Sequence, residues 1–163
     1  MPTYRAVVEY DGTDFCGLQF QTDVRTVAGE IERALSVLFA GPVKISAAGC
    51  TDAGVHASGQ VISFSSERTF PQGRLALALN ANLPHDVRVR SAGLAPDGFS
   101  ARFDAQERTY EYRILNRPQP SALDRRFAHH VHRPFGLALA RRAALDLVGE
   151  HDFVALCGLL PER

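Results

Sequence analysis

Tryptophan is absent from these 163 residues, methionine occurs once and cysteine three times. Cys16, Cys50 and Cys157 are odd in number, lie far apart and form no C-x-x-C pair, so neither a disulfide framework nor a zinc site is encoded. No apolar run approaches the ~18 residues of a membrane-spanning helix, and the first residues show no basic-then-apolar signal pattern. We therefore expect a protein of the reducing cytoplasm that binds no membrane and no metal.

Net charge is missing as well, because 18 basic residues balance 18 acidic ones. The charge is nevertheless uneven: residues 1–49 carry four basic and six acidic side chains, whereas residues 102–133 carry seven arginines and four acidic side chains. Of the 18 basic residues 17 are arginine, whose guanidinium group makes bidentate contacts with phosphate. A genome-wide codon preference explains this count equally well, so the arginine-rich segment is a candidate phosphate-binding surface and no more.

The hydrophobic residues that are present, 45% of the chain, are spaced as in a folded α+β protein. Alternating and helical spacings follow one another in the order βαββαβ, which is the ferredoxin-like arrangement. Thr26 can cap the first helix, Gly41-Pro42 can end it, and Pro71 suits the first turn of the second. The expected strands are 4–10, 43–47, 60–66 and 87–93, and the expected helices are 27–38 and 71–83.

The pattern changes after Pro96, so we expect a first domain at residues 1–96 and a second at residues 97–163. Residues 97–104 are typical of a connector, residues 108–115 alternate as a strand with Tyr110 on one face, and a helix is expected at about 137–148.

Asp52 lies in a glycine-flanked stretch between two expected strands, where a loop can present a carboxylate to a ligand. An isolated Thr-Asp-Ala-Gly is more often a turn in which the aspartate bonds nearby backbone amides. The residues around this tetrapeptide decide between these alternatives, because the resemblance described next covers far more than four residues.

The string GCTDAGVHASGQ at residues 49–60 resembles the active-site loop of the TruA family of tRNA pseudouridine synthases. Further family motifs follow in the family's order, so that the resemblance runs from about residue 4 to residue 153. They are YDGT at 10–13, NANLP at 80–84, FSARFDA at 99–105 and R-x-Y-x-Y at 108–112.

The resemblance implies the pseudouridine synthase fold, with a ferredoxin-like half and the start of a second α+β half. It also implies isomerisation of uridine to pseudouridine at tRNA positions 38, 39 and 40, without a cofactor, by a homodimer that binds tRNA. Asp52 matches the family's catalytic aspartate, which acts either as a nucleophile or by removing a sugar proton. A nearby arginine would hold the pKa of this carboxyl down, as opposite charges do.

Three more residues are expected to bind the substrate. Tyr110 matches the tyrosine that packs against the target base, although its alternation alone favours a place in the core of a sheet. Arg102 and Arg108 are candidates for contact with the tRNA backbone, although surface ion pairing is the commoner fate of a single arginine.

The sequence departs from the family pattern in places that bear on activity. Cys50 stands where the family has an arginine that assists base flipping, and Leu18 and Phe20 stand where it has tryptophan and arginine. The family's chain continues beyond the segment that ends here at residue 163, so we expect an incomplete second domain and a chain that is inactive on its own.

Two other functions remain open at this point. One is a non-catalytic RNA-binding remnant that keeps only the ferredoxin-like half. The other is a hydrolase built on Cys50 and His56, which needs a lowered thiol pKa that no neighbouring cation in the sequence supplies. A loop histidine that donates a hydrogen bond to the backbone is the simpler interpretation of His56.

Overall fold

The central strand of the protein is β1 (Thr3–Tyr10), which buries every second side chain as its alternating sequence predicts. The computed structural model describes residues 1–71 and 73–156. In it β1 lies inside a four-stranded sheet of order β2-β3-β1-β4, with each neighbouring pair antiparallel. The other strands are β2 (Ile45–Ala47), β3 (Ala57–Ser65) and β4 (Val87–Leu94). The predicted βαββαβ order and the α+β class are confirmed.

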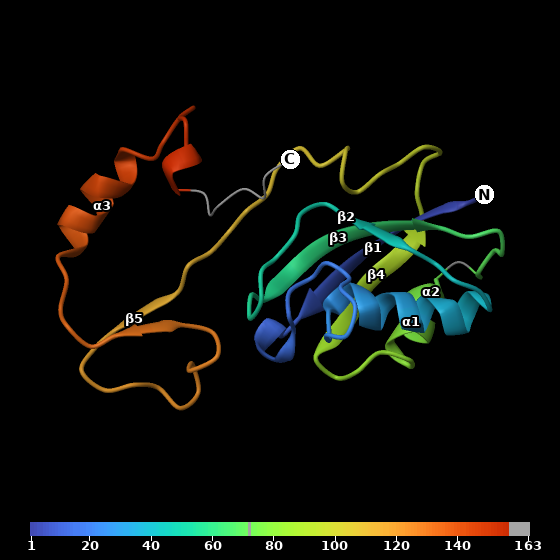
Figure 1. Ribbon diagram of the computed structural model, residues 1–163, viewed down its shortest axis with the longest axis horizontal. Helices are drawn as coiled ribbons and strands as arrows, with labels where there is room; N and C mark the ends of the chain where they lie inside the picture. Colours follow the sequence, from blue (N-terminus) through green and yellow to red (C-terminus); the bar gives the residue numbers. More distant parts are fainter. Residues whose placement is uncertain (72, 157–163) are drawn as a thin grey trace. The chain divides into compact units, whose positions relative to one another are not determined.

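The two helices between these strands, α1 (Val27–Phe39) and α2 (Leu75–Asn80), lie on the same face of the sheet (Figure 1). Thr26 caps α1 as predicted, since its side chain accepts a hydrogen bond from the Gly29 amide at 3.2 Å. The core between helices and sheet is built from β1, β3, β4 and both helices. Its main side chains are Tyr4, Ala6, Val8, Tyr10, Val27, Ile31, Leu35, Ile62, Phe64, Leu75, Leu79, Val87 and Val89.

Helix α2 is shorter than predicted at both ends, because Pro71, Gly73 and Arg74 precede it and residues 81–83 follow it. Gly73 has a φ of +76°, which lies outside the right-handed helical region and prevents a helix from starting at Pro71. At the other end the Asn80 side chain bonds the backbone of Val89 in β4, donating to its carbonyl at 2.9 Å and accepting from its amide at 2.8 Å. This side chain ties α2 to the edge strand of the sheet, where it satisfies two backbone groups that no strand pairs.

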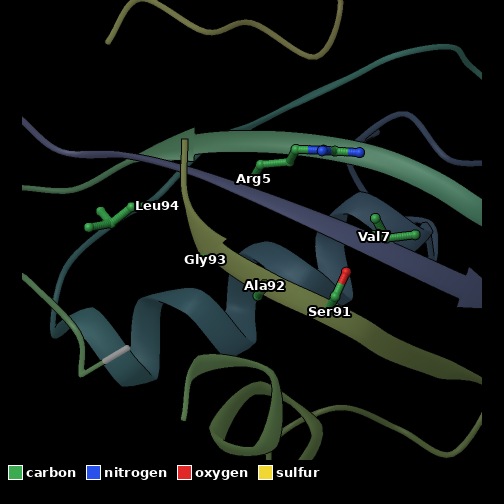
Figure 2. A pocket seen from close by; sticks show the side chains of 6 residues that line it. All are labelled: Arg5, Val7, Ser91, Ala92, Gly93 and Leu94. Atoms are coloured by element: carbon green, nitrogen blue, oxygen red, sulfur yellow. The ribbon is translucent and has the colours of Figure 1, made fainter. Parts of the chain in front are cut away.

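The opposite face of the sheet carries a shallow hollow of about 260 Å³ beside the first half of β1. Figure 2 shows Arg5, Val7 and Ser91 around it. Arg5 and Val7 alternate with the buried residues of β1, and Val7 faces Ser91 in the register of β1 and β4. The hollow therefore lies on the helix-free face, toward the opposite end of β1 from Tyr10.

The chain divides into two compact units, residues 1–111 and 112–163. In the second unit β5 (Ile114–Asn116) pairs in parallel with β6 (His129–Val131), followed by the helix α3 (Leu137–Leu145) and the 3-10 turn η2 (Val154–Leu156). None of residues 112–155 is buried. No helix among the described residues is long and apolar enough to cross a bilayer.

The predicted strand at 108–115 is wrong for most of its length, because only Ile114 and Leu115 of that range pair with another strand. Tyr110 is 67% exposed and therefore does not belong to a sheet core, the position that its alternating pattern favoured. A strand needs a partner for its backbone groups, which a pattern of side chains cannot supply. The predicted helix near 137–148 is confirmed as α3. The domain boundary after Pro96 stays a prediction.

Arg25 forms the most extensive ion-pair cluster of the first unit. Its guanidinium donates to both carboxylate oxygens of Asp86, at 2.8 and 3.0 Å, and to Glu30 at 2.9 Å, and it lies 4.1 Å from the centre of the Phe15 ring. The hydrogen bonds from Arg25 hold the pKa of Asp86 below its usual value. This cluster fastens the loop after β1 to the start of α1 and to the segment before β4.

Replacing Asp86 tests the cluster. Asp86→Asn should lower the free energy of unfolding at neutral pH by about 1–2 kcal/mol, a modest figure because the Arg25 side chain is 37% exposed and solvent screens the pair. Since the folded-state pKa of Asp86 is depressed, its contribution is present above the unfolded value of 3.8 and is lost as the pH falls through the folded value.

Urea unfolding at neutral pH and at about pH 3 measures this difference. Glu67→Gln, a change of the same kind at an exposed site, is the control and should alter stability at neither pH. An Asp86→Asn deficit that stays constant from neutral to acid pH would show that the ion pair contributes nothing to stability.

Candidate active site

Asp52 lies in the loop of residues 48–56 that joins β2 to β3. The loop is held by the segment that follows β1, residues 15–18. The Leu18 amide donates to the Thr51 carbonyl at 3.0 Å, and the Gly54 amide donates to the Phe15 carbonyl at 3.3 Å. Two backbone hydrogen bonds thus fix the loop, on both sides of Asp52, to the segment that follows the YDGT turn.

Two glycines allow these segments to approach so closely. A side chain at Gly17 would place its Cβ 2.8 Å from the Thr51 carbonyl oxygen, and the φ of Gly17 is +90°. A Cβ at Gly12 would overlap the Val55 carbonyl group. Any other residue at either position would have to push the aspartate loop away from β1.

The side chain of Asp52 is exposed at this position. Within residues 1–71 and 73–156, no side chain bonds or pairs with its carboxylate, so the arginine expected to lower its pKa is not among them. The loop presents the carboxylate to solvent, as its sequence predicts. Its catalytic role stays a prediction.

Arg108 and Tyr110 lie against the beginning of the same loop. The Arg108 Nε donates to the Ala48 carbonyl at 2.6 Å. A Cβ at Gly49 would lie 3.1 Å from the Arg108 Nε and 3.7 Å from the Tyr110 hydroxyl oxygen. The absence of a side chain at Gly49 therefore lets a guanidinium and a phenol approach the chain three residues before Asp52.

Arg102, the other predicted substrate-binding arginine, has no recorded contact with this loop. Its guanidinium lies 5.6 Å from the centre of the Phe103 ring. The preceding residue, Ala101, is buried, and its amide donates to the Ser63 hydroxyl of β3 at 2.9 Å. The structure thus brings Arg108 to the aspartate loop and leaves Arg102 over the sheet.

The Cys50 and His56 pair does not form a hydrolase site. In the part of the chain that the structure describes, no hydrogen bond joins the two and no cluster of side chains could hold a metal ion. The His56 Nδ1 accepts a hydrogen bond from the Gly12 amide at 3.1 Å and lies 3.1 Å from the Asp11 Oδ1, and donation from this ring to the backbone stays a prediction. Cys50 is exposed, and Cys157 lies outside the described residues.

Tyr10 and Thr51 are residues of the site that the sequence did not single out. Their hydroxyl oxygens lie 2.7 Å apart. The period-two pattern predicted a buried Tyr10 ring, but 41 residues separate it from its partner, and no sequence spacing announces such a contact.

Gly49→Ala should displace Arg108, because a methyl group 3.1 Å from its Nε leaves too little room. We expect the Arg108 Nε–H to lose its bond to Ala48 and to exchange faster with solvent, which ¹⁵N NMR of the arginine Nε groups measures. Gly59→Ala, where a Cβ meets nothing within 4 Å, is the matched control. Unchanged Arg108 exchange in Gly49→Ala would mean that this contact does not hold the guanidinium.

Comparisons with known proteins indicate the family to which this chain is similar. A family model described as tRNA pseudouridine synthase matches residues 6–104. Proteins named tRNA pseudouridine synthase A include one from Halalkalibacterium halodurans, 41% identical over 95% of this chain and 59% of the relative. A second, from Chlorobaculum tepidum, is 44% identical over 99% of this chain and 65% of the relative. A third, from Methylobacterium radiotolerans, is 46% identical over 95% of this chain and 62% of the relative.

The chain spans about three fifths of the length of these curated relatives. The family match includes most of β1, the whole aspartate loop and the Ala101 segment, whereas Arg108 and Tyr110 lie beyond its last residue. The family model and the relatives agree, and the relatives match nearly the whole length of this chain. The chain therefore belongs to the tRNA pseudouridine synthase family.

Proposed function

We propose that this protein isomerises uridine to pseudouridine in the anticodon arm of tRNA, at positions 38, 39 and 40, with Asp52 as the reacting carboxylate. The observation that carries the proposal is an exposed carboxylate that bonds no side chain among the residues the structure describes, on a loop held by backbone bonds on both sides. Family membership supports the type of reaction, and the curated relatives bear the name of this activity.

The reaction needs few groups. The bond between C1′ and N1 of the uridine breaks, the uracil turns and a bond forms between C1′ and C5. The C5 hydrogen is then released as a proton, and N1 takes up a proton. Asp52 attacks C1′ or removes a sugar proton, and either route uses an anion positioned against the ribose. No bound metal or cofactor takes part in the proposed reaction.

The neighbours of Asp52 suit the remaining tasks. Tyr110 offers an exposed aromatic face for a base turned out of its stack, beside Gly49. Arg108, fixed at its Nε by Ala48, can direct the rest of its guanidinium to a phosphate. For Arg102, which has no recorded contact with the loop, we propose a contact with the tRNA backbone farther from the reacting uridine.

One observation favours a second function, that of a non-catalytic RNA-binding remnant. No arginine in the described ranges, 1–71 and 73–156, pairs with Asp52, and the residue two positions before it is Cys50, which carries no guanidinium charge. Both functions share tRNA as the partner. For the catalytic form we also propose a homodimer and a cytoplasmic location, where its substrate is found.

Release of tritium from tRNA labelled at uridine C5 separates the two functions. We expect no release from the chain alone, and release from a chimera that continues after residue 163 with the matching part of the Chlorobaculum tepidum relative. In the chimera Asp52→Asn should lower release by at least about a hundredfold, since it removes the positioned anion.

Asp97→Asn, at another exposed loop aspartate, controls for the loss of one carboxylate and should leave the rate unchanged. Release that persists in Asp52→Asn would remove Asp52 from the reaction. A chimera that binds tRNA but releases no tritium would favour the non-catalytic function.

Restoring the family's arginine should increase the rate more than the affinity. Cys50 is exposed, so the loop has room for the longer side chain. In the chimera Cys50→Arg should raise kcat by about 10-fold to 100-fold, the usual effect of one preorganised charged contact, and change the Kd for tRNA by less. Steady-state kinetics measures kcat, and filter binding measures the Kd for tRNA.

Cys16→Arg is the matched control, because it adds the same charge at an exposed cysteine of the neighbouring loop. An equal gain in both variants would indicate a general effect of charge on tRNA binding. Unfolding of Cys50→Arg would show that the loop is less open than its exposure indicates.

A further inference from the structure

Tyr10, the last residue of β1, joins the core of the first unit to the aspartate loop. Its ring is 5% exposed and packs in the same core as Tyr4 and Val8. Its hydroxyl leaves the core and lies 2.7 Å from the Oγ1 of Thr51, a distance at which either hydroxyl can donate. A buried phenol thus bonds the residue directly before Asp52.

Thr51 is held from two directions. Its side chain bonds Tyr10, and its backbone carbonyl accepts from the Leu18 amide at 3.0 Å. Consecutive Cα atoms are about 3.8 Å apart, so a displacement of Thr51 moves the Asp52 backbone with it. Within residues 1–71 and 73–156 no side chain bonds the Asp52 carboxylate, so the contacts of its neighbours determine where the carboxylate lies.

The Tyr10 hydroxyl keeps its proton throughout the physiological range. Burial raises the pKa of Tyr10 above its usual value and outweighs the hydrogen bond with Thr51, which lowers it. The phenol therefore meets the Thr51 hydroxyl as a neutral group.

We infer that Tyr10 is a positioning residue for Asp52 and acts through the hydroxyl of Thr51. The buried ring anchors the phenol in the core, and its hydroxyl holds Thr51 through the hydrogen bond. Thr51 in turn fixes the backbone position from which the Asp52 side chain extends. This inference rests on the proposed function for its effect on the reaction, but its structural part can be tested without activity.

Tyr10→Phe removes the hydroxyl and keeps the buried ring. Tyr4→Phe is the matched control, since Tyr4 lies on the same strand, is equally buried and accepts one hydrogen bond, from the Phe70 amide at 3.0 Å, far along β1 from the loop. Thr51→Val removes the second hydroxyl of the pair, and Thr51→Ser keeps it.

The first measurement is ¹³C NMR of the whole chain labelled at the aspartate carboxyl carbons, with the Asp52 resonance assigned by its loss in Asp52→Asn. We expect this resonance to shift in Tyr10→Phe and Thr51→Val and to stay in place in Tyr4→Phe and Thr51→Ser. A Tyr10→Phe spectrum equal to that of Tyr4→Phe overturns the inference.

The second measurement uses the chimera described above. Tyr10→Phe should lower kcat by about tenfold and leave KM unchanged, because misplacing a reacting group weakens the transition state and not substrate binding. An unchanged kcat, in a chimera whose tritium release depends on Asp52, also overturns the inference. Release that persists in Asp52→Asn contradicts the proposed function instead, and the NMR result then still decides whether Tyr10 positions Asp52.

Discussion

The antiparallel pairing of β1 with both β3 and β4 is the constraint on which the first unit depends. It aligns Tyr10 at the end of β1 with Ala57 at the start of β3, so the loop before β3 returns beside the turn that follows β1. The same pairing sends the alternate side chains of β1 under α1, where they form the core. A slip of one residue would expose that core and separate Tyr10 from Thr51.

The site is rigid where it holds Asp52 and open where Asp52 meets solvent. Backbone bonds from Phe15 and Leu18, two close-packed glycines and the Arg25 cluster fasten the loop after β1, and that loop fastens the aspartate loop. None of these contacts involves the Asp52 carboxylate. Such a division is what preorganised catalysis requires, since the reacting group must be placed without being neutralised.

The described residues of the site offer little charge to stabilise a reacting group. Cys50 offers no charge, and Arg108 is the cation that the described structure brings closest to the loop, through its bond to Ala48. The exposed Tyr110 beside it leaves an aromatic surface available to a ligand. Within the described residues the site is thus better built for placing a base and a carboxylate than for stabilising the charge that develops in a reaction.

The sequence by itself determined the order of the elements, the buried face of β1, the Thr26 cap and the loop that carries Asp52, because each follows from local spacing and turn chemistry. Only the tertiary structure decided where α2 begins, since Gly73 turns away from the helix, and that Tyr110 is exposed, since most of residues 108–115 found no partner strand. It alone also brought together Tyr10 with Thr51 and Gly49 with Arg108. Such contacts join residues about 40 to 60 positions apart, and they depend on strand register and close backbone approach, which no periodicity of one segment encodes.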